Sequence, residues 1–393
     1  MGSIHGKLRT FALPALVIAL AGCATTNSKG VAYTQASVDE YLALGIERGT
    51  IAQREDGMRT SGASGSYEWW YFDSVFSDGS TLVISFETKD IVNPAGPLKP
   101  IITFDLTRPD GTKVTRSRQV GPKSFSASRD GCDVKIGDNH ISGDLHSYSV
   151  HVAIEDVAAD LELVGTVPAW RPETGVSVFK KGGEHYFAWL PSVPQGRISG
   201  TVTVAGKTEA VAGSGYHDHN WGDVAMTSLI HDWYWGRAQV GAYTVIAAWI
   251  TASEAYGSDV MPVFMLAKDG KIVADDESKV RFTAGRVHAN PKTGKPVADR
   301  LVYDYDDGAR HYRVTFDRKA TIEEFPFTDS MKPFKRFLAS LARFDGAYHR
   351  FTGSVTVEEL SGTQVLDSAV QDSAVWELMY FGHAPKPNPA STK

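Results

Sequence analysis

Short runs of β-forming residues, separated by tight-turn signals, fill almost the whole chain beyond Ser66. The runs FSDGSTLVISFET, ISGTVTVAG and AYTVIAAWIT are rich in valine, isoleucine, threonine and aromatic residues, and DG, NP, KP and SG dipeptides punctuate the sequence. Many strands without helices between them predict antiparallel sandwiches or barrels and argue against a parallel sheet with crossover helices. We therefore expect an all-β fold.

The chain also repeats its signature segments in the same order. EWWYF begins at Glu68 and DWYWG begins at Asp232, and in each an acid precedes aromatic residues. ISGTVTV in the first half matches FTGSVTV in the second, and each is followed by a strand that pairs aromatic residues with an acid, GYHDHNW and AVWELMY. A chain of 393 residues is long enough for two domains. The repeat therefore predicts two copies of one β-domain, over residues 61–225 and 226–386.

Residues 1–23 have the form of a bacterial lipoprotein signal. Lys7 and Arg9 precede the apolar run FALPALVIALAG, which is too short for a stable membrane span and is followed by Cys23. LAGC resembles the lipobox, in which the cysteine is lipidated and becomes the new N-terminus, and the alanine after it resembles the outer-membrane sorting pattern. We expect a lipid-anchored protein on the periplasmic face of the outer membrane, with residues 24–60 as a tether and a short helix.

The composition excludes some classes of partner. The net charge is -6, whereas nucleic-acid-binding proteins present a basic stripe. Nine tryptophans, fifteen tyrosines and eighteen phenylalanines can line an apolar pocket as well as fill a core. We therefore expect a hydrophobic small molecule as the partner, and we interpret Cys132, which lies among turn residues, as a structural thiol.

One helix is predicted inside the second copy. Residues 329–346, DSMKPFKRFLASLARFDG, place aromatic and leucine residues at helical spacing with lysines and arginines among them. We expect this short amphipathic helix to pack on a barrel wall. A contact with the membrane that holds the lipid anchor is the alternative.

Four motifs together resemble a known superfamily. YEWWYFDS, GSGYHDHNWG, WYWGRA and VWELMYFG, in this order, are similar to the carotenoid 1,2-hydratase (hydroxyneurosporene synthase) and AttH-like proteins over nearly everything after about Gly65. The resemblance implies two tandem lipocalin-like antiparallel β-barrels and no metal or other cofactor. Because the superfamily includes hydratases, pericyclases and lipoproteins of unknown role, the function depends on the site.

The segment GSGYHDHNWG, residues 213–222, carries the densest group of chemically active side chains. Alternate residues of a strand share a face, which gives two sets: His217, His219 and Trp221 on one side, and Tyr216, Asp218 and Asn220 on the other. Two histidines at this spacing suit a metal, but a third ligand would have to come from His231 or Asp232, and the chain has neither an HExxH motif nor a cysteine pair. We therefore expect no metal. The motif could also be a structural junction in which Asp218 accepts hydrogen bonds from a histidine or a tryptophan.

The third interpretation is catalytic. Hydration of an alkene needs a buried acid that stays protonated, aromatic faces that stabilise a cation, and a base that orients water. We predict Glu68 and Asp218 as acids and His219 as the base, with Asp232 a further candidate acid. The predicted pocket consists of Trp70, His217, Trp221, Trp235, Arg237 and Tyr243.

Two of these pocket residues carry further expectations. Arg237, among tryptophans, either forms a stacked salt bridge or holds a carboxylate or phosphate head group. As the resemblance implies, the carotenoid hydratases have a tyrosine followed two residues later by an aspartate that is the proton source. Here the residue two positions after Tyr243 is Val245, so that acid is missing.

The sequence therefore predicts a protein that binds a long isoprenoid-like or lipid-like ligand, with hydratase-type addition of water to a C=C bond. The main alternative is a non-catalytic lipoprotein carrier of the AttH type that acts beside a membrane transporter. A pericyclase-like cyclase is the second alternative.

The lipid anchor can be tested directly. Growth with an alkyne fatty acid should label the wild-type protein but not Cys23→Ser, because the thiol of the lipobox cysteine is the attachment point. Click detection after gel electrophoresis measures the label, and equal labelling of both proteins would refute the anchor.

Overall fold

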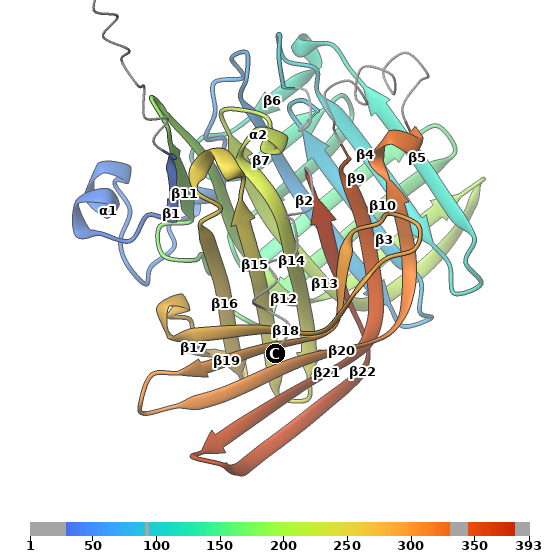
Figure 1. Ribbon diagram of the computed structural model, residues 1–393. Coiled ribbons are helices and arrows are strands. Elements are labelled where there is room, and N and C mark those ends of the chain that lie inside the picture. The colour runs from blue at the N-terminus through green and yellow to red at the C-terminus, as the bar shows by residue number, and fades with distance from the viewer. Residues whose placement is uncertain (1–28, 91–93, 331–344, 382–393) are drawn as a thin grey trace, which may run out of the picture.

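The computed structural model describes residues 29–90, 94–330 and 345–381 and shows two antiparallel sheets (Figure 1). The predicted all-β fold is confirmed. Cys23 and the predicted signal segment lie outside the described residues, as do residues 331–344 of the predicted amphipathic helix. In the described part of the chain, no helix is long and apolar enough to cross a membrane.

The first sheet holds the strands of the N-terminal half. They are β1 (Val31–Thr34), β2 (Tyr67–Phe76), β3 (Thr81–Glu87), β4 (Ile101–Thr107), β5 (Lys113–Gln119), β6 (Phe125–Ala127), β7 (Cys132–Ile136), β8 (Asn139–Gly143), β9 (Ser147–Ile154), β10 (Val157–Gly165), β11 (Val176–Lys180), β12 (Glu184–Val204) and β13 (Lys207–Gly222). The order is β5-β4-β3-β2-β13-β12-β10-β9-β8-β7-β6, and β11 joins β12 to β1.

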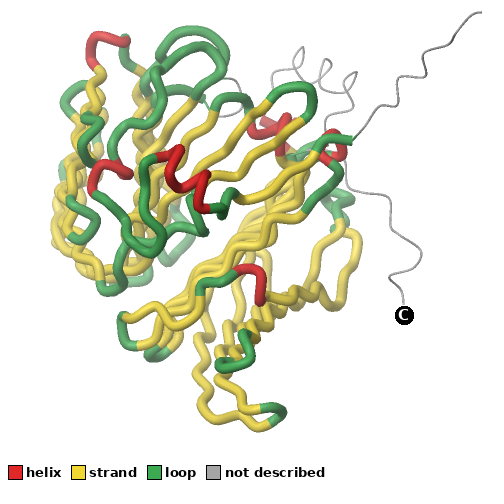
Figure 2. Tube along the Cα trace, turned by 90° about the vertical axis from the view of Figure 1, so that its left-hand side faces the viewer, coloured by secondary structure: helices red, strands yellow, loops and turns green. Residues whose placement is uncertain are grey.

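The second sheet holds the strands of the C-terminal half. They are β14 (Ile230–Val240), β15 (Tyr243–Ala252), β16 (Val260–Lys268), β17 (Lys271–Ala274), β18 (Val280–Ala289), β19 (Pro296–Asp306), β20 (His311–Pro326), β21 (Ala347–Ser361) and β22 (Gln364–Tyr380). The order is β17-β16-β15-β14-β22-β21-β20-β19-β18. Figure 2 shows the two sheets as separate bodies of strands that pack against each other.

Short helices connect or flank the strands. They are α1 (Val38–Leu44), α2 (Met226–Leu229) and the 3₁₀ turns η1 (Gln53–Asp56), η2 (Pro122–Ser124), η3 (Glu254–Tyr256), η4 (Glu277–Lys279) and η5 (Phe327–Ser330). The segment predicted as a tether and short helix therefore contributes more than α1. Strand β1 pairs with β11, and η1 carries the buried Asp56. The segment is polar on average, so its composition does not reveal the single apolar and acidic residues that are buried.

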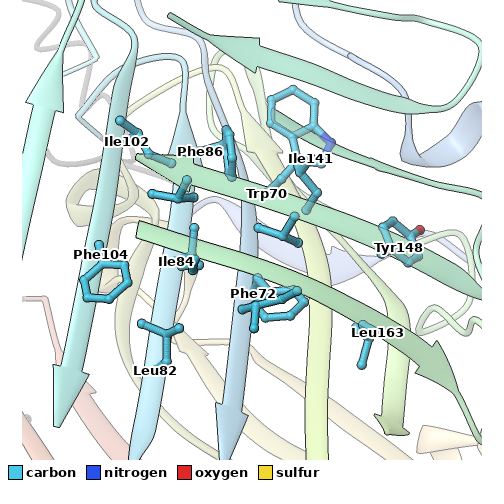
Figure 3. Packing of buried hydrophobic residues seen from close by; sticks show 14 of the residues in the cluster. Trp70, Phe72, Leu82, Ile84, Phe86, Ile102, Phe104, Ile141, Tyr148 and Leu163 are labelled. Carbon is cyan, nitrogen blue, oxygen red and sulfur yellow. The ribbon is translucent and has the colours of Figure 1, made fainter. Parts of the chain in front are cut away.

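Strand alternation gives each sheet two apolar faces. Inside the first sheet, Trp70, Phe72, Ile84 and Phe104 belong to one core cluster (Figure 3). A second cluster fills the inside of the second sheet. A third cluster joins the outer faces of the two sheets and includes Tyr216 from β13 together with residues of β15 and β16. The two halves are therefore held together by an apolar interface.

The strand order around the signature segments is the same in both halves. In the first sheet β13 lies between β12 and β2, and in the second β22 lies between β21 and β14. Asp218 on β13 pairs in register with Tyr71 on β2, and Glu377 on β22 pairs with Trp235 on β14. These two acids therefore occupy equivalent positions of the repeat.

Candidate functional site

A cavity of about 610 Å³ lies between the outer faces of the two sheets. Its size falls within the range of roughly 300–1,000 Å³ that small-molecule sites occupy. Strands β2, β3, β4, β5, β12 and β13 line it from the first sheet, and β14, β15, β20, β21 and β22 line it from the second. The signature segments of both halves thus contribute to one cavity.

Aromatic side chains form much of the cavity wall. They are Trp69, Tyr71, Phe187, Trp189, Trp233, Trp235 and Tyr348. The cause is strand alternation, since in β2 the side chains of Trp70 and Phe72 point into the first core and leave their neighbours to face the cavity.

Strand β14 likewise directs Trp233 and Trp235 to the cavity, and Gly236 lets the opposite face of the strand pack closely on the core of the second sheet. Gly236 follows Trp235 and points into the second sheet, where a Cβ atom would lie 2.8 Å from a ring carbon of Phe316 and 2.9 Å from the Cβ of Trp376. Only glycine fits at this approach without a shift of the neighbours. The WYWG sequence therefore directs two tryptophans to the cavity while its glycine admits close packing behind them.

Asp218 is a buried carboxyl group at the cavity wall. Its Oδ2 accepts hydrogen bonds from Trp189 Nε1 at 2.8 Å and from the Tyr216 hydroxyl at 2.7 Å, and its Oδ1 accepts one from Asn220 Nδ2 at 2.7 Å. Burial raises the pKa of Asp218 above its usual value, although these three donors oppose the rise. The site therefore favours the neutral acid more than water does.

Glu377 repeats this environment on the opposite wall. Trp233 Nε1 donates to its Oε1 at 3.0 Å, and the Tyr348 hydroxyl donates to its Oε2 at 3.0 Å. Burial raises the pKa of Glu377, and the charge of Asp218 contributes to the rise. Each half of the molecule thus presents one acid held by a tryptophan and a tyrosine.

Glu87 is a third carboxyl group on the cavity wall. It lies beside Trp69 in the register of β2 and β3, and the Ser85 hydroxyl donates to its Oε1 at 2.9 Å. Burial raises the pKa of Glu87 to about 7, and the charges of Asp90 and Asp105 add to this effect. Glu87 is therefore poised to exchange a proton near neutral pH.

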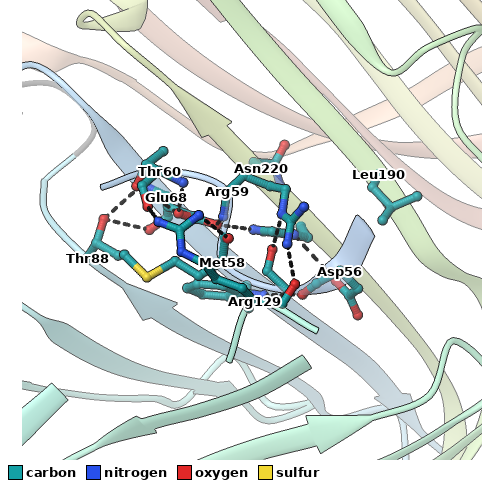
Figure 4. Close-up of polar contacts among 12 residues, drawn as sticks. Asp56, Met58, Arg59, Thr60, Glu68, Thr88, Arg129, Leu190 and Asn220 are labelled. Atoms are coloured by element: carbon teal, nitrogen blue, oxygen red, sulfur yellow. Dashed lines mark hydrogen bonds and ion pairs between the residues drawn. The ribbon is translucent and has the colours of Figure 1, made fainter. Parts of the chain in front are cut away.

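The histidines of GYHDHNW point away from the cavity, into the core of the first sheet. His219 Nε2 donates to Glu68 Oε1 at 2.8 Å, and both side chains are fully buried. Glu68 also accepts from the Arg59 backbone N–H and from the N–H and hydroxyl of Thr60 (Figure 4). Four donors therefore use the lone pairs of Glu68 within the protein.

Asp56 of η1 joins the two histidines. Its carboxylate lies 3.4 Å from His217 Nε2 and 3.5 Å from His219 Nδ1, and it accepts a hydrogen bond from the Tyr148 hydroxyl. Burial alone would raise the pKa of Asp56, but the charge of His217 holds it below its usual value. Burial would likewise lower the pKa of His217, but the charge of Asp56 raises it. The cluster is a buried ion pair that ties η1 to β13.

This cluster is also the place where a metal could be held. Atoms of Asp56, Cys132 and His217 that can ligate a metal lie within 4.8 Å of one another, and all three side chains are buried. The sequence candidates for the third ligand, His231 and Asp232, instead contact each other on β14 at 2.5 Å. Because the charges of Asp56 and His217 already compensate each other, we keep the expectation that no metal is bound.

The structure divides the predicted catalytic residues between the two faces of β13. Asp218 lines the cavity, whereas His219 and Glu68 lie in the first core and do not border the cavity. The three side chains therefore do not meet in one cavity, because residues 218 and 219 of a strand point in opposite directions. We therefore assign no catalytic role to His219 or Glu68.

The predicted pocket residues are divided in the same way. Trp235 lines the cavity. Trp70 and His217 are buried within the first sheet, and the Trp221 ring lies tilted against His219 with ring centroids 4.8 Å apart. Tyr243 lies in the core of the second sheet, where its hydroxyl donates to Asp367 at 2.7 Å.

Arg237 joins the two sheets instead of lining the cavity. It forms an ion pair with Asp73 of β2, and its guanidinium carbon lies 4.8 Å from the centroid of the Tyr216 ring. Of the two roles predicted for Arg237, the structure therefore shows the stacked salt bridge.

Several cavity residues were missed by the sequence analysis: Trp69, Tyr71, Glu87, Trp189, Trp233, Tyr348, Arg350 and Glu377. The repeat signal contained Glu377, because AVWELMY aligned with GYHDHNW. Nothing in the local sequence of Glu87 or Arg350 marked them, since an acid or arginine on a strand is usually solvent-exposed.

Comparisons with known proteins agree with this architecture. A family model described as AttH-like matches residues 102–320. A quinolone epoxide rearrangement protein, asqO, from Emericella nidulans is 23% identical over 294 residues, which cover 67% of this chain and 76% of that protein. A hydroxyneurosporene dehydrogenase from Chlorobaculum tepidum is 24% identical over 210 residues, 44% of this chain and 54% of that protein. The crystal structure of an AttH protein from Nitrosomonas europaea superposes with a TM-score of 0.55 at 15% identity, covering 85% of this chain and 97% of that one.

The pKa of Glu87 predicts a pH dependence of stability. A carboxyl group whose pKa is higher in the folded than in the unfolded chain binds more protons when folded, so stability falls as the pH rises between the two values. For Glu87 this window runs from the usual value of 4.5 to about 7. Glu87→Gln has no carboxyl group to titrate at this position, so its stability should fall less than that of the wild type over this pH window. Its Tm should therefore exceed that of the wild type at pH 8. The exposed Glu162→Gln is the control, and an unchanged pH profile in Glu87→Gln would contradict the account.

The buried ion pair predicts a metal-free protein. Elemental analysis after purification without chelator or histidine tag should find zinc, iron and manganese well below one atom per chain. A stoichiometric metal that disappears in Cys132→Ser would show that the three donor atoms form a metal site instead.

Proposed function

Because the chain belongs to the AttH-like family, we propose that it binds a largely apolar, unsaturated small molecule in the inter-sheet cavity and catalyses an acid-promoted reaction on it. Addition of water to a C=C bond and rearrangement of the bound molecule are the two reaction types that this chemistry covers. Proteins similar to this chain are named for an epoxide rearrangement and for hydroxyneurosporene, and these names support chemistry on small organic molecules.

One observation carries the proposal. Asp218 and Glu377 occupy equivalent positions in the two halves, both face one aromatic cavity, and burial raises the pKa of both carboxyl groups. A pair of carboxyl groups whose environments favour protonation is the equipment that general acid catalysis needs near neutral pH.

The steps of a hydration follow from this pair. One protonated carboxyl group gives its proton to a carbon of the double bond, whose π electrons form the new C–H bond and leave a cation on the other carbon. Water attacks the cation, and the other carboxyl group, as a carboxylate, accepts the proton that the water loses. In a rearrangement the same acid protonates an epoxide oxygen, and the C–O bond breaks to leave a hydroxyl group and a carbocation. A substituent then migrates with its bonding electrons to the cationic carbon, and the new cation loses a proton to the carboxylate that the acid has become.

The aromatic wall suits the charged intermediate of either reaction. The faces of Trp69, Trp233 and Trp235 carry the negative part of the ring quadrupole, which attracts a cation by about 0.5–2 kcal/mol per ring.

The catalytic roles can be tested with isosteric variants. Asp218→Asn and Glu377→Gln should bind ligand with little change but lower turnover by roughly 10²–10⁴-fold, the usual contribution of one general acid or base. Binding is measured as saturable quenching of tryptophan fluorescence by an organic extract of the native host. Turnover is measured by mass spectrometry as a gain of 18 Da or as a new isomer.

Asp105→Asn is the matched control, because Asp105 also lines the cavity but lies on β4, away from the repeated acid positions. It should keep both binding and turnover. Saturable binding by the wild type with no product from any extract would favour a non-catalytic carrier. Unfolding of both acid variants would mean that these carboxyl groups are structural.

A further inference from the structure

Arg350 presents a guanidinium group to the cavity without a partner. It lies on β21 and lines the cavity, and among the described residues no hydrogen bond or ion pair reaches it. The neighbouring cations differ from it in this respect. Arg237 is paired with Asp73, and Lys113 is paired with Glu323 at 2.9 Å.

Two acids stand in register with Arg350, and both have other partners; Glu323 on β20 forms an ion pair with Lys113. Arg350 pairs in register with Glu377, but the two oxygens of Glu377 accept from Trp233 and Tyr348, and no ion pair with Arg350 forms. Burial also favours the neutral form of Glu377 by raising its pKa. Burial would lower the pKa of Arg350, but neighbouring tyrosines and the charges of Asp73 and Glu377 raise it. Among the described residues, however, none of these groups hydrogen-bonds or forms an ion pair with its guanidinium, whose N–H donors stay available for a ligand.

A partly buried guanidinium whose N–H donors meet no protein acceptor needs water or a ligand to satisfy them. The guanidinium is planar and offers five N–H donors in a fixed fork that matches two adjacent oxygens, as in a carboxylate or a 1,3-dicarbonyl enolate. Tryptophan and tyrosine rings make up the surrounding wall and suit an apolar body.

We propose that Arg350 is an anion-binding subsite and that the ligand is an apolar, unsaturated molecule with a carboxylate or enolate at one end. This inference rests on the proposed function and names its substrate class. It excludes neutral hydrocarbons as the preferred ligands. The register of β21 and β22 places the anionic end beside Glu377, so the group that binds and the group that transfers a proton lie side by side.

The anion would also act on the neighbouring acid. In the free protein the positive charge of Arg350 is one of the influences that lower the pKa of Glu377, against the larger effect of burial. A bound carboxylate neutralises that charge and thereby favours protonated Glu377. Binding of the correct ligand then prepares the proton donor.

A matched pair of probes tests the subsite. We would titrate the full chain with a conjugated polyene fatty acid and with its methyl ester and follow quenching of tryptophan fluorescence. The wild type should bind the acid more tightly than the ester. Arg350→Gln should weaken binding of the acid by roughly tenfold to a hundredfold, the usual worth of a charge-assisted hydrogen-bond pair, and leave the ester unchanged. Arg350→Lys, which keeps the charge but loses the fork, should fall between them.

Lys123→Gln is the control for general electrostatics, because it removes one positive charge from an exposed side chain that does not line the cavity. It should leave binding of both probes unchanged. Equal affinity of the wild type for acid and ester, or an equal loss of both in Arg350→Gln, would overturn the subsite and leave the proposed function standing. Binding that depends on Arg350 without any turnover by the wild type would support the subsite and contradict the proposed catalysis.

Discussion

The two-residue period of the strands is the constraint on which this structure depends. In β2, β13, β14 and β22, one set of side chains fills the inside of a sheet and the other set forms the inter-sheet contact and the cavity. The period explains why adjacent residues have unrelated surroundings. Asp218 borders the cavity, while His219, one residue further, is buried against Glu68.

Contacts on the inner face of β13 hold in place the residues of its outer face, which lines the cavity. The contacts of Asp56 with His217 and His219 anchor η1 inside the first sheet and fix the strand on which Asp218 stands. A carboxyl group can keep a raised pKa only if its wall does not open to water, and a strand fixed from behind meets that condition. The histidines of the motif thus contribute to the site as positioning residues.

The sequence predicted the fold class, the repeat and the faces of residues 216–221, because these depend on local period and order. It could not predict which segments would meet. Asp56 lies in a polar stretch read as a tether, and its contact with His217 joins residues 161 positions apart in the chain. Glu87 and Arg350 have ordinary strand neighbours in sequence, and only the packing of one sheet on the other removes them from bulk water.

The two halves differ at one position, and this difference makes the two ends of the cavity unlike. In the second half Arg350 stands opposite Glu377 across β21 and β22. In the first half the register of β12 with β13 shifts between Leu190 and Val193, so no residue of β12 is in register with Asp218. This bulge gives the cavity one wall with an acid beside a cation and one wall with an acid among aromatic rings. An elongated ligand with an anionic end would therefore bind in one orientation, with its head at Glu377 and its apolar body extending toward Asp218.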